Sequence, residues 1–282
     1  MKLVRIGAVG REQPGLIDPQ GVIRDLTAHV PDIRGDVLTD AGLAKLRAID
    51  PYSLPPVSGE QRYGAPVGGV GKFICVGLNY SDHAAESGMA EPEQPVIFMK
   101  ATSAIVGPND DVILPRGAAK ADWEVELGVV IGSVARDVSI ADALSHVAGY
   151  LVVNDVSERA FQLEHGGQWV KGKSLDTFGP IGPWLVTRDE VPDPQSLGMT
   201  LSVNGRCYQN GNSRTMVFGV AHLVSYISRY MSLHPGDVIS TGTPAGVGLG
   251  QKPPVYLRAG DVMELAIDTL GRQRQRVVAH TK

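Results

Sequence analysis

Short apolar runs separated by turn residues dominate this chain and predict a fold rich in β structure. Near the N-terminus, residues 2–9 and 14–27 predict strands, with Asp-Pro-Gln-Gly as a turn between two apolar runs of the second segment. Apolar residues at helical spacing predict a short helix over residues 39–49. The high glycine and proline content, 34 and 19 residues, favours many turns between short strands.

A stretch dense in Pro and Gly over residues 50–72 indicates a connection that runs over the surface. We therefore expect a small N-terminal α/β domain over residues 1–68 and a larger domain over residues 69–282. The whole fold is expected to be α+β and β-rich.

The larger domain alternates strand patterns with helical ones, and the first of these starts in SDHAAESG, where Ser81 or Asp82 can cap the first helical turn. Helical spacing predicts helices over residues 139–150 and 218–231, and residues 163–183 predict a long glycine-rich loop. Asn-Gly and Pro-Gly pairs mark turns between the later strands. The expected strands lie within residues 73–80, 96–108, 108–115, 123–132, 150–157, 198–211, 235–248 and 259–271.

Composition narrows the classes of function. With 282 residues and 43% hydrophobic content, the chain can bury a full core. Its 26 basic and 30 acidic residues form no basic cluster, which argues against nucleic-acid binding and favours a small-molecule partner. No apolar run approaches the roughly 20 residues of a membrane span, and the N-terminus lacks a secretion signal, so we expect a cytoplasmic protein. The isolated Cys75 and Cys207 are expected to be buried thiols.

Two acids interrupt the apolar stretch DWEVELGVVIG, residues 122–132. Glu124 and Glu126 lie two apart and share one face of the predicted strand, where like charges repel unless a cation lies between them. Asp155 ends the apolar strand YLVVND, and three converging carboxylates would suit Mg²⁺ or Mn²⁺. A strand with one solvated face is the alternative, and the spacing alone does not place Asp155 beside the two glutamates.

A second candidate group lies in DHAAE. His83 and Glu86 are three residues apart, so on a helical turn the carboxylate can orient the imidazole as a general base. A surface histidine with an incidental ion pair remains the alternative.

Four further polar residues are candidates on their own: Lys100 at the end of VIFMK, Arg159 and Gln162 in SERAFQ, and Lys173 in KGKS. Each also fits a solvated strand end or an exposed helix face. The segment STGTPAGVG could wrap an anion with backbone N–H groups, but it lacks the lysine of a phosphate loop, so we exclude a nucleotide site.

Six motifs in this order resemble the fumarylacetoacetate hydrolase family: GLNYSDHAAESG, PVIFMKATSA, DWEVELGVVIG, GYLVVNDVSERAFQ, KGKSLDTFGPIGP and STGTPAGVG. The resemblance spans roughly residues 70 to 270. It implies a mixed β-roll that encloses the active site, a divalent metal that is usually Mg²⁺, and a homodimer or larger homo-oligomer.

The resemblance also assigns roles to the candidate residues. It implies that the metal ligands are Glu124, Glu126 and Asp155, and that His83 and Glu86 form the catalytic dyad. It implies an active-site role for Lys173, and substrate contacts for the remaining four residues: Lys100, Arg159, Gln162 and Thr243 of the TGTP turn. The segment from His83 through MAEPEQP resembles the family's lid over the substrate.

Within the family, LVRIGAVGREQPGLID, KSLDTFGPIGPWLVTRDEV and FGVAHLVSYISRYMSL resemble the bacterial branch that hydrolyses 2,4-diketo-3-deoxy sugar acids, such as the L-rhamnonate and L-fuconate derivatives. This branch implies cleavage of a carbon–carbon bond to pyruvate and a hydroxy acid. An oxaloacetate-type decarboxylase or tautomerase, another acylpyruvate hydrolase and a non-catalytic sugar-acid binding protein remain alternatives. A ureidoglycolate lyase fits less well, because the family's metal site suits a 2-oxo acid.

Overall fold

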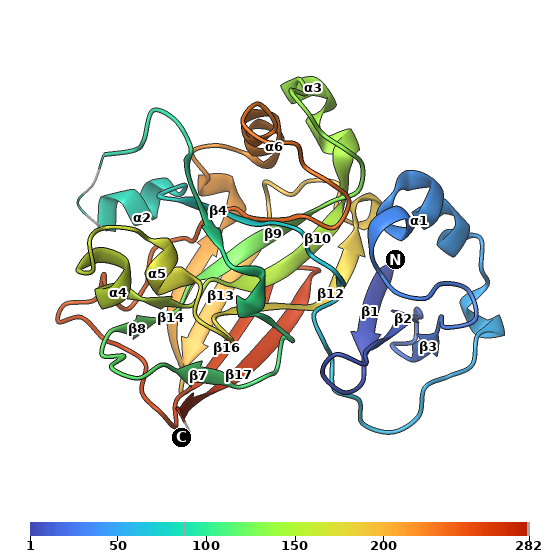
Figure 1. Ribbon diagram of the computed structural model, residues 1–282, viewed down its shortest axis with the longest axis horizontal. Helices are drawn as coiled ribbons and strands as arrows, with labels where there is room; N and C mark the ends of the chain where they lie inside the picture. Colours follow the sequence, from blue (N-terminus) through green and yellow to red (C-terminus); the bar gives the residue numbers. More distant parts are fainter. Residues whose placement is uncertain (87, 89, 281–282) are drawn as a thin grey trace.

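The computed structural model describes residues 1–86, 88 and 90–280 of the 282-residue chain. Within this part of the chain, the strands form a ten-stranded sheet, a five-stranded sheet and a two-stranded pair, with short helices around them (Figure 1). The expected β-rich α+β fold class is confirmed. The lid expected from His83 through MAEPEQP includes residues 87 and 89, which lie outside the described residues.

The ten-stranded sheet mixes parallel and antiparallel pairs, and its central strands carry the candidate site. Its order is β3 (Ile23–Asp25), β2 (Gln13–Ile17), β1 (Lys2–Ile6), β12 (Gly179–Thr187), β10 (Val147–Asn154), β9 (Val125–Ile131), β15 (Val238–Ser240), β4 (Phe73–Gly77) and β5 (Val96–Lys100), with β6 (Ile105–Val106) beside β12.

The five-stranded sheet packs against one face of the ten-stranded sheet. The hairpin formed by β13 (Gly198–Val203) and β14 (Arg206–Asn212) turns at Asn204-Gly205, where both residues have positive φ, as the Asn-Gly pair predicts. The order of this sheet is β14 (Arg206–Asn212), β13 (Gly198–Val203), β16 (Val262–Ile267), β17 (Gly271–Ala279) and β7 (Val112–Leu114), and the separate pair is β8 (Ala121–Asp122) with β11 (Ser157–Glu158).

The helices are short, and three of them confirm the sequence predictions. Residues 39–49 contain α1, the helix start in SDHAAESG is that of α2, and residues 218–231 contain α6, whereas the helix expected over residues 139–150 is wrong beyond its first turn. None of the described helices has the length and apolar character that crossing a membrane requires. The helices are α1 (Asp40–Arg47), α2 (Ser81–Glu86), α3 (Ile140–Ala143), α4 (Arg159–Leu163), α5 (Val170–Lys173) and α6 (Val220–Ser228).

The predicted helix over residues 139–150 fails because its apolar residues do not share a buried face. Ile140 and Leu144 remain 50% and 38% exposed, while Val147 is buried as the first residue of β10. The loop expected over residues 163–183 contains α5 and the start of β12, a strand that we did not predict. Proline and glycine argue against a central strand in a sequence pattern, yet Pro180 and Pro183 lie in β12.

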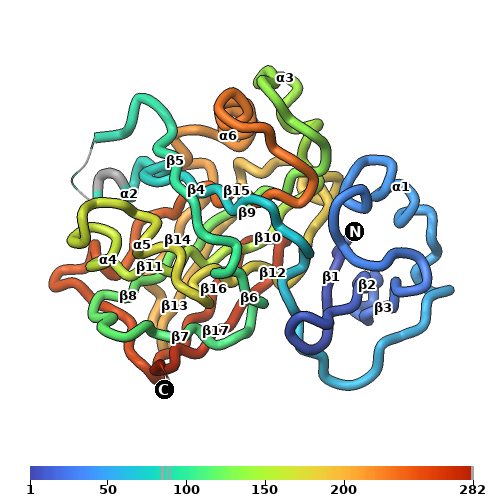
Figure 2. The backbone as a smooth tube through the Cα atoms, viewed as in Figure 1, coloured from blue at the N-terminus to red at the C-terminus, as the bar shows by residue number. Residues whose placement is uncertain are grey.

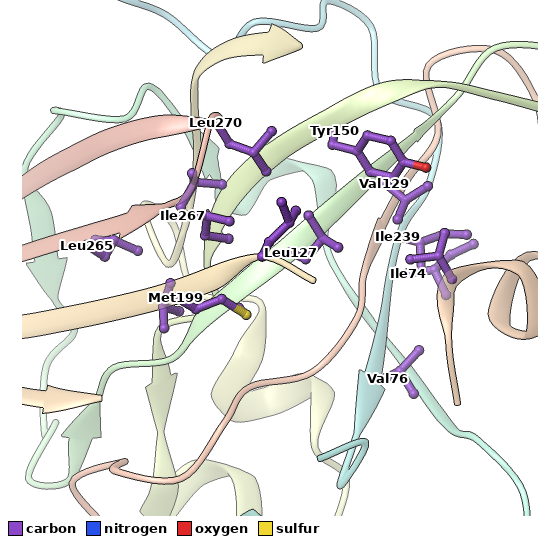
Figure 3. Close-up of a cluster of buried hydrophobic side chains, with 14 of the residues drawn as sticks. Ile74, Val76, Leu127, Val129, Tyr150, Met199, Ile239, Leu265, Ile267 and Leu270 are labelled. Atoms are coloured by element: carbon purple, nitrogen blue, oxygen red, sulfur yellow. The ribbon is translucent and has the colours of Figure 1, made fainter. Parts of the chain in front are cut away.

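Both faces of the central strands are buried, because alternate side chains enter two different hydrophobic cores. Leu127 of β9 and Tyr150 of β10 point into the core shared with the five-stranded sheet and α6 (Figure 3). Val130 of β9 and Leu151 of β10 point into a second core, which includes side chains of the N-terminal segment. Polar side chains on these strands therefore need protein partners instead of water.

The N-terminal segment extends the ten-stranded sheet through β1, which pairs antiparallel with β12. In Figures 1 and 2 this segment, coloured blue, forms one side of the molecule beside β12. The division at residue 68 falls in the connection before β4 and stays a prediction.

The two cysteines differ in environment. Cys75 is buried in β4, where burial raises the pKa of its thiol. The expectation of a buried Cys207 is wrong: this residue is exposed, because β14 is an edge strand and Cys207 follows its hairpin turn closely.

Candidate active site

The pairing of β9 with β10 brings the three predicted metal ligands together. In this antiparallel register Val153 lies opposite Glu126 and Asn154 opposite Val125, so Asp155 lies beside Glu124 and its N–H donates to the Glu124 carbonyl at 2.9 Å. One carboxylate oxygen from each of Glu124, Glu126 and Asp155 lies within 4.8 Å of the other two. The adjacency that spacing alone did not show follows from strand register.

The two glutamates do not lie on a solvated strand face. Glu124 and Glu126 are only 4% and 2% exposed, while Trp123 and Leu127 on the opposite face pack in the hydrophobic core. Isolated buried carboxylates are costly, so this arrangement requires compensating charge.

Two lysines supply part of that charge. Lys173 in α5 places its Nζ 2.6 Å from Glu124 Oε2 and 2.9 Å from Asp155 Oδ2. Lys100, at the end of β5, places its Nζ 2.5 Å from Asp155 Oδ1 and donates to the Val156 carbonyl at 3.0 Å. Both lysines are buried, which excludes the solvated alternatives for them.

Arg159 joins three further groups at the start of α4. Its Nη2 donates to Glu124 Oε1 at 2.7 Å, its Nε to Asp122 Oδ2 at 2.8 Å, and its Nη1 to Gln162 Oε1 at 3.1 Å. The β8–β11 pair explains this position, because Ser157 lies opposite Asp122 and α4 begins two residues later. Arg159 and Gln162 are therefore parts of one buried network instead of an exposed helix face.

Glu126 has fewer compensating partners than the other two acids. Its Oε2 accepts hydrogen bonds from Ser240 Oγ at 2.5 Å and from the Gly242 N–H at 2.8 Å, and among the described residues no group donates to its Oε1. Burial, together with the nearby Asp155 and Glu124 carboxylates, raises the pKa of Glu126 well above its ordinary value.

The opposite shift occurs at Glu124. Burial alone would raise its pKa, but the Lys173 and Arg159 cations outweigh burial and lower the pKa of Glu124 to about 2. Conversely, the Asp155 and Glu124 carboxylates outweigh the burial of Lys173 and raise the pKa of its ammonium. Glu124 and Lys173 are consequently ionised near neutral pH.

A count of buried charges explains the role of Glu126. In the described part of the chain, four carboxylates, Asp122, Glu124, Glu126 and Asp155, surround three bases, Lys100, Arg159 and Lys173. With Glu126 protonated, the charges balance at three against three. With Glu126 ionised and a divalent cation added, the cluster carries a net charge of +1, which an anionic ligand can neutralise.

The residues therefore fit a hard divalent cation. The donor atoms are all carboxylate oxygens, the type that Mg²⁺ and Mn²⁺ prefer. Glu126 retains one oxygen without a protein donor among the described residues, and Glu124 and Glu126 both line a cavity.

The second predicted pair faces the same cavity. In α2, His83 Nδ1 lies 3.2 Å from Glu86 Oε2, which leaves Nε2 for proton transfer. The Gly246 N–H donates to both Glu86 oxygens, at 3.0 and 3.1 Å. The backbone amide of Gly246, in the 246–250 segment, thus holds the Glu86 carboxylate that contacts His83.

The cavity that the predicted pair and the two glutamates face has a volume of about 470 Å³. It is lined by His83, Glu86 and Lys173 as well as by the two glutamates. Gln162, Arg159 and Thr243 also form its wall.

Two predicted residues lie outside the lining of this cavity. Lys100 and Asp155 lie behind the wall, where each holds the other. Lys100 therefore does not reach the cavity in this arrangement. It contacts Asp155 instead and positions that carboxylate. Thr243 does line the wall, but its Oγ1 is occupied by the Val125 carbonyl and by Gln209 Nε2.

Several residues of the site escaped the sequence prediction. Asp122 is one residue of this kind, although the period of a strand places it on the same face as Glu124 and Glu126. Phe98, Ser240 and Val247 lie within the quoted motifs but were not singled out, and Trp169, Leu249, Gln251 and Lys252 lie outside those motifs.

We expect the affinity of the metal-free protein for Mg²⁺ to increase with pH. Glu126 must release its proton to become a ligand, so affinity should rise by up to about tenfold per pH unit while Glu126 stays protonated. Titration calorimetry in buffers of different ionisation enthalpy measures the released proton. The raised pKa of Glu126 also makes the unfolding free energy of the metal-free protein depend on pH. The stabilising contribution of protonated Glu126 is fully present below pH 4.5, the ordinary pKa of a glutamate, and it is lost as the pH rises through the pKa of Glu126 in the folded protein.

Glu126→Gln is the control for this titration, since it has no proton to release at that position. A dissociation constant of the unsubstituted protein that is constant between about pH 5 and 8, with no proton released, would contradict the assignment.

Comparisons with known proteins agree with this geometry. The family model described as Fumarylacetoacetate (FAA) hydrolase C-terminal matches residues 72–278. A Burkholderia multivorans protein, named only provisionally and as a hydrolase without a substrate, is 66% identical over 276 residues, which cover 98% of each chain.

Two solved structures share both sequence and fold with this chain. The fumarylacetoacetate hydrolase of Exiguobacterium antarcticum is 38% identical with a TM-score of 0.86, over 99% of this chain and 100% of the other. Maleylpyruvate hydrolase from Sphingobium sp. SYK-6, solved with manganese(II) and pyruvate, is 30% identical with a TM-score of 0.83 over 100% of both chains. The resemblance seen in the motifs is confirmed, and this chain belongs to the fumarylacetoacetate hydrolase family.

Proposed function

We propose that the protein hydrolyses a carbon–carbon bond in a 2,4-diketo-3-deoxy sugar acid, such as 2,4-diketo-3-deoxy-L-rhamnonate, to pyruvate and a hydroxy acid. One observation carries the proposal: Glu124 and Glu126 of the buried acidic cluster line the same cavity as the His83–Glu86 pair. Glu124, Glu126 and Asp155 would hold Mg²⁺ or Mn²⁺. A family relative that has been solved with manganese and pyruvate supports this choice of product and metal.

The charges of the site select an anionic 2-oxo acid. A divalent cation, when bound, would polarise the oxo and carboxylate oxygens of the substrate and withdraw electrons from its reacting carbons. The net charge of +1 in the loaded cluster matches one carboxylate of the substrate. Lys173, whose positive charge is part of this count, lines the cavity in which that carboxylate would bind.

His83 is positioned to act as the general base. Glu86 holds Nδ1, so Nε2 takes a proton from water and the water oxygen bonds to C4 of the substrate. As the C4 carbonyl re-forms, the C3–C4 bond breaks and its electron pair passes to C3 and the 2-oxo group. Lys173 stabilises the developing negative charge, and C3 takes the proton back from His83 Nε2. The products are pyruvate and the acid released from C4.

The remaining walls would surround the acyl part of the substrate. Phe98 and Trp169 pack edge to face with ring centroids 5.3 Å apart, and with Leu249 they form an apolar surface. Gln251 and Lys252 add polar groups to the same cavity. This combination suits a short carbon chain that also carries hydroxyl groups.

The products of the reaction test the proposal. Incubation with Mg²⁺ and a panel of 2,4-diketo-3-deoxy acids, followed by mass spectrometry, should show pyruvate and a hydroxy acid, with ¹⁸O from labelled water in the hydroxy acid. Carbon dioxide from oxaloacetate without such label would instead support the decarboxylase alternative. Binding without turnover of any panel member would support a sugar-acid binding protein and contradict the proposal.

A further inference from the structure

We propose that Asp122 is a positioning residue that ties the metal-site glutamate Glu124 to the cavity-wall segment 246–250. The inference rests on the proposed function, because it concerns the same metal site. Asp122 is fully buried, with 0% exposure, and it does not line the cavity. Its two carboxylate oxygens nevertheless contact both halves of the site.

The first contact leads to the acidic cluster. Asp122 Oδ2 accepts from Arg159 Nε at 2.8 Å, and the Nη2 of the same guanidinium donates to Glu124 Oε1 at 2.7 Å. A planar guanidinium fixes the relative positions of groups bound to its two edges. Asp122 therefore sets the orientation of Arg159, and Arg159 sets the orientation of Glu124.

The second contact leads to the cavity wall. The Gly248 N–H donates to Asp122 Oδ1 at 2.6 Å, and the Leu249 N–H donates to Oδ2 at 3.0 Å. Gly248 suits this approach, since a Cβ there would lie 2.0 Å from the Val255 carbonyl oxygen and 2.7 Å from Asp122 Oδ1. The wall can thus come close to the buried carboxylate only without a side chain at this position.

The same segment also holds the dyad. Gly246, two residues before Gly248, donates its N–H to Glu86, which in turn contacts His83. One buried carboxylate consequently joins the base, the wall and the metal-site glutamate into one hydrogen-bonded chain. Displacement of Asp122 should shift both Glu124 and the base, although Asp122 contacts neither directly.

Asp18 offers a matched control for a purely structural role. It is also buried, accepts from the Gln20 and Val22 N–H groups at 2.9 Å each, and accepts from Arg24 Nε at 2.8 Å. Like Asp122, Asp18 accepts two backbone N–H groups and one arginine Nε. It lies in the β2–β3 hairpin, far along the sheet from the cavity. Asp18→Asn should therefore lower stability without changing the site.

The test measures Mn²⁺ binding to the metal-free protein by titration calorimetry, and kcat and KM at saturating Mn²⁺. Asp122→Asn places an amide N–H or an uncharged oxygen against Arg159, so we expect Mn²⁺ affinity to fall by about 10- to 100-fold, as for other groups that orient metal ligands. We expect kcat to fall as well, because the base is displaced, while Asp18→Asn leaves affinity and kcat unchanged.

The outcomes distinguish a failure of this inference from a failure of the proposed function. If the unsubstituted protein binds Mn²⁺ but Asp122→Asn binds it equally and keeps its kcat, the positioning role is wrong and the proposed function stands. If the unsubstituted protein does not bind Mn²⁺, both are wrong. Asp122→Glu, which keeps the charge but lengthens the side chain, should also lose affinity and serves as the second variant if Asp122→Asn does not fold.

Discussion

Asp155→Asn and Glu126→Gln should both reduce turnover of a 2,4-diketo acid to background, but only the first should destabilise the fold. Asp155 neutralises the buried Lys100 and Lys173, at 2.5 and 2.9 Å, so its loss leaves buried cations without a partner. Breaking a buried ion pair in this way costs about 3–5 kcal/mol of unfolding free energy. Glu126 pairs with no cation among the described residues, and glutamine keeps an oxygen for Ser240 and Gly242.

Urea unfolding of the metal-free variants, followed by tryptophan fluorescence, measures the difference. Calorimetry with Mn²⁺ on the same samples should show weakened binding for both variants, which links the loss of turnover to the metal site. Equal stability of the two metal-free variants would contradict the charge assignment. Undiminished Mn²⁺ binding by either would remove that residue from the set of ligands.

The sequence predicted parts of this site that depend on local geometry. Glu124 and Glu126 could be placed on one face because the two-residue period of a strand is independent of tertiary structure. His83 and Glu86 followed in the same way from helical spacing, and the structure places them 3.2 Å apart. Local periodicity fixes which side chains share a face, but not what lies opposite that face.

Contacts between distant segments required the fold. Asp155 joins the two glutamates only through the register of β9 and β10, and Lys100 turned out to lie behind Asp155 instead of in the cavity wall. Strand periodicity places Asp122 on the face of the two glutamates, but its partners Gly248 and Leu249 lie more than 120 residues away, so the sequence did not reveal what it contacts. The resemblance to a family supplied roles for the polar residues, and it could not supply this link.

The fold errors have a similar cause. The pattern of β12 contains Pro180 and Pro183, which local rules exclude from a central strand, yet burial between β1 and β10 stabilises it there. Conversely, Ile140 and Leu144 have helical spacing but remain on the surface, so the helix ends after four residues. In both cases packing between distant parts of the chain decided against the local preference.

His83→Asn should lower kcat by about 10²- to 10⁴-fold, the usual contribution of a general base, while Mn²⁺ binding to the metal-free protein stays unchanged. Asparagine keeps a polar group near Glu86 but has no nitrogen that can accept the proton from water. His146→Asn is the matched control, because His146 is also half-buried and its Nδ1 is held by Ser133 Oγ at 2.9 Å, away from the cavity. Steady-state kinetics at saturating Mn²⁺ provide the measurement. If His83→Asn and His146→Asn kept the same near-full kcat, another group would have to take the proton, and the pairing of His83 with Glu86 would be structural.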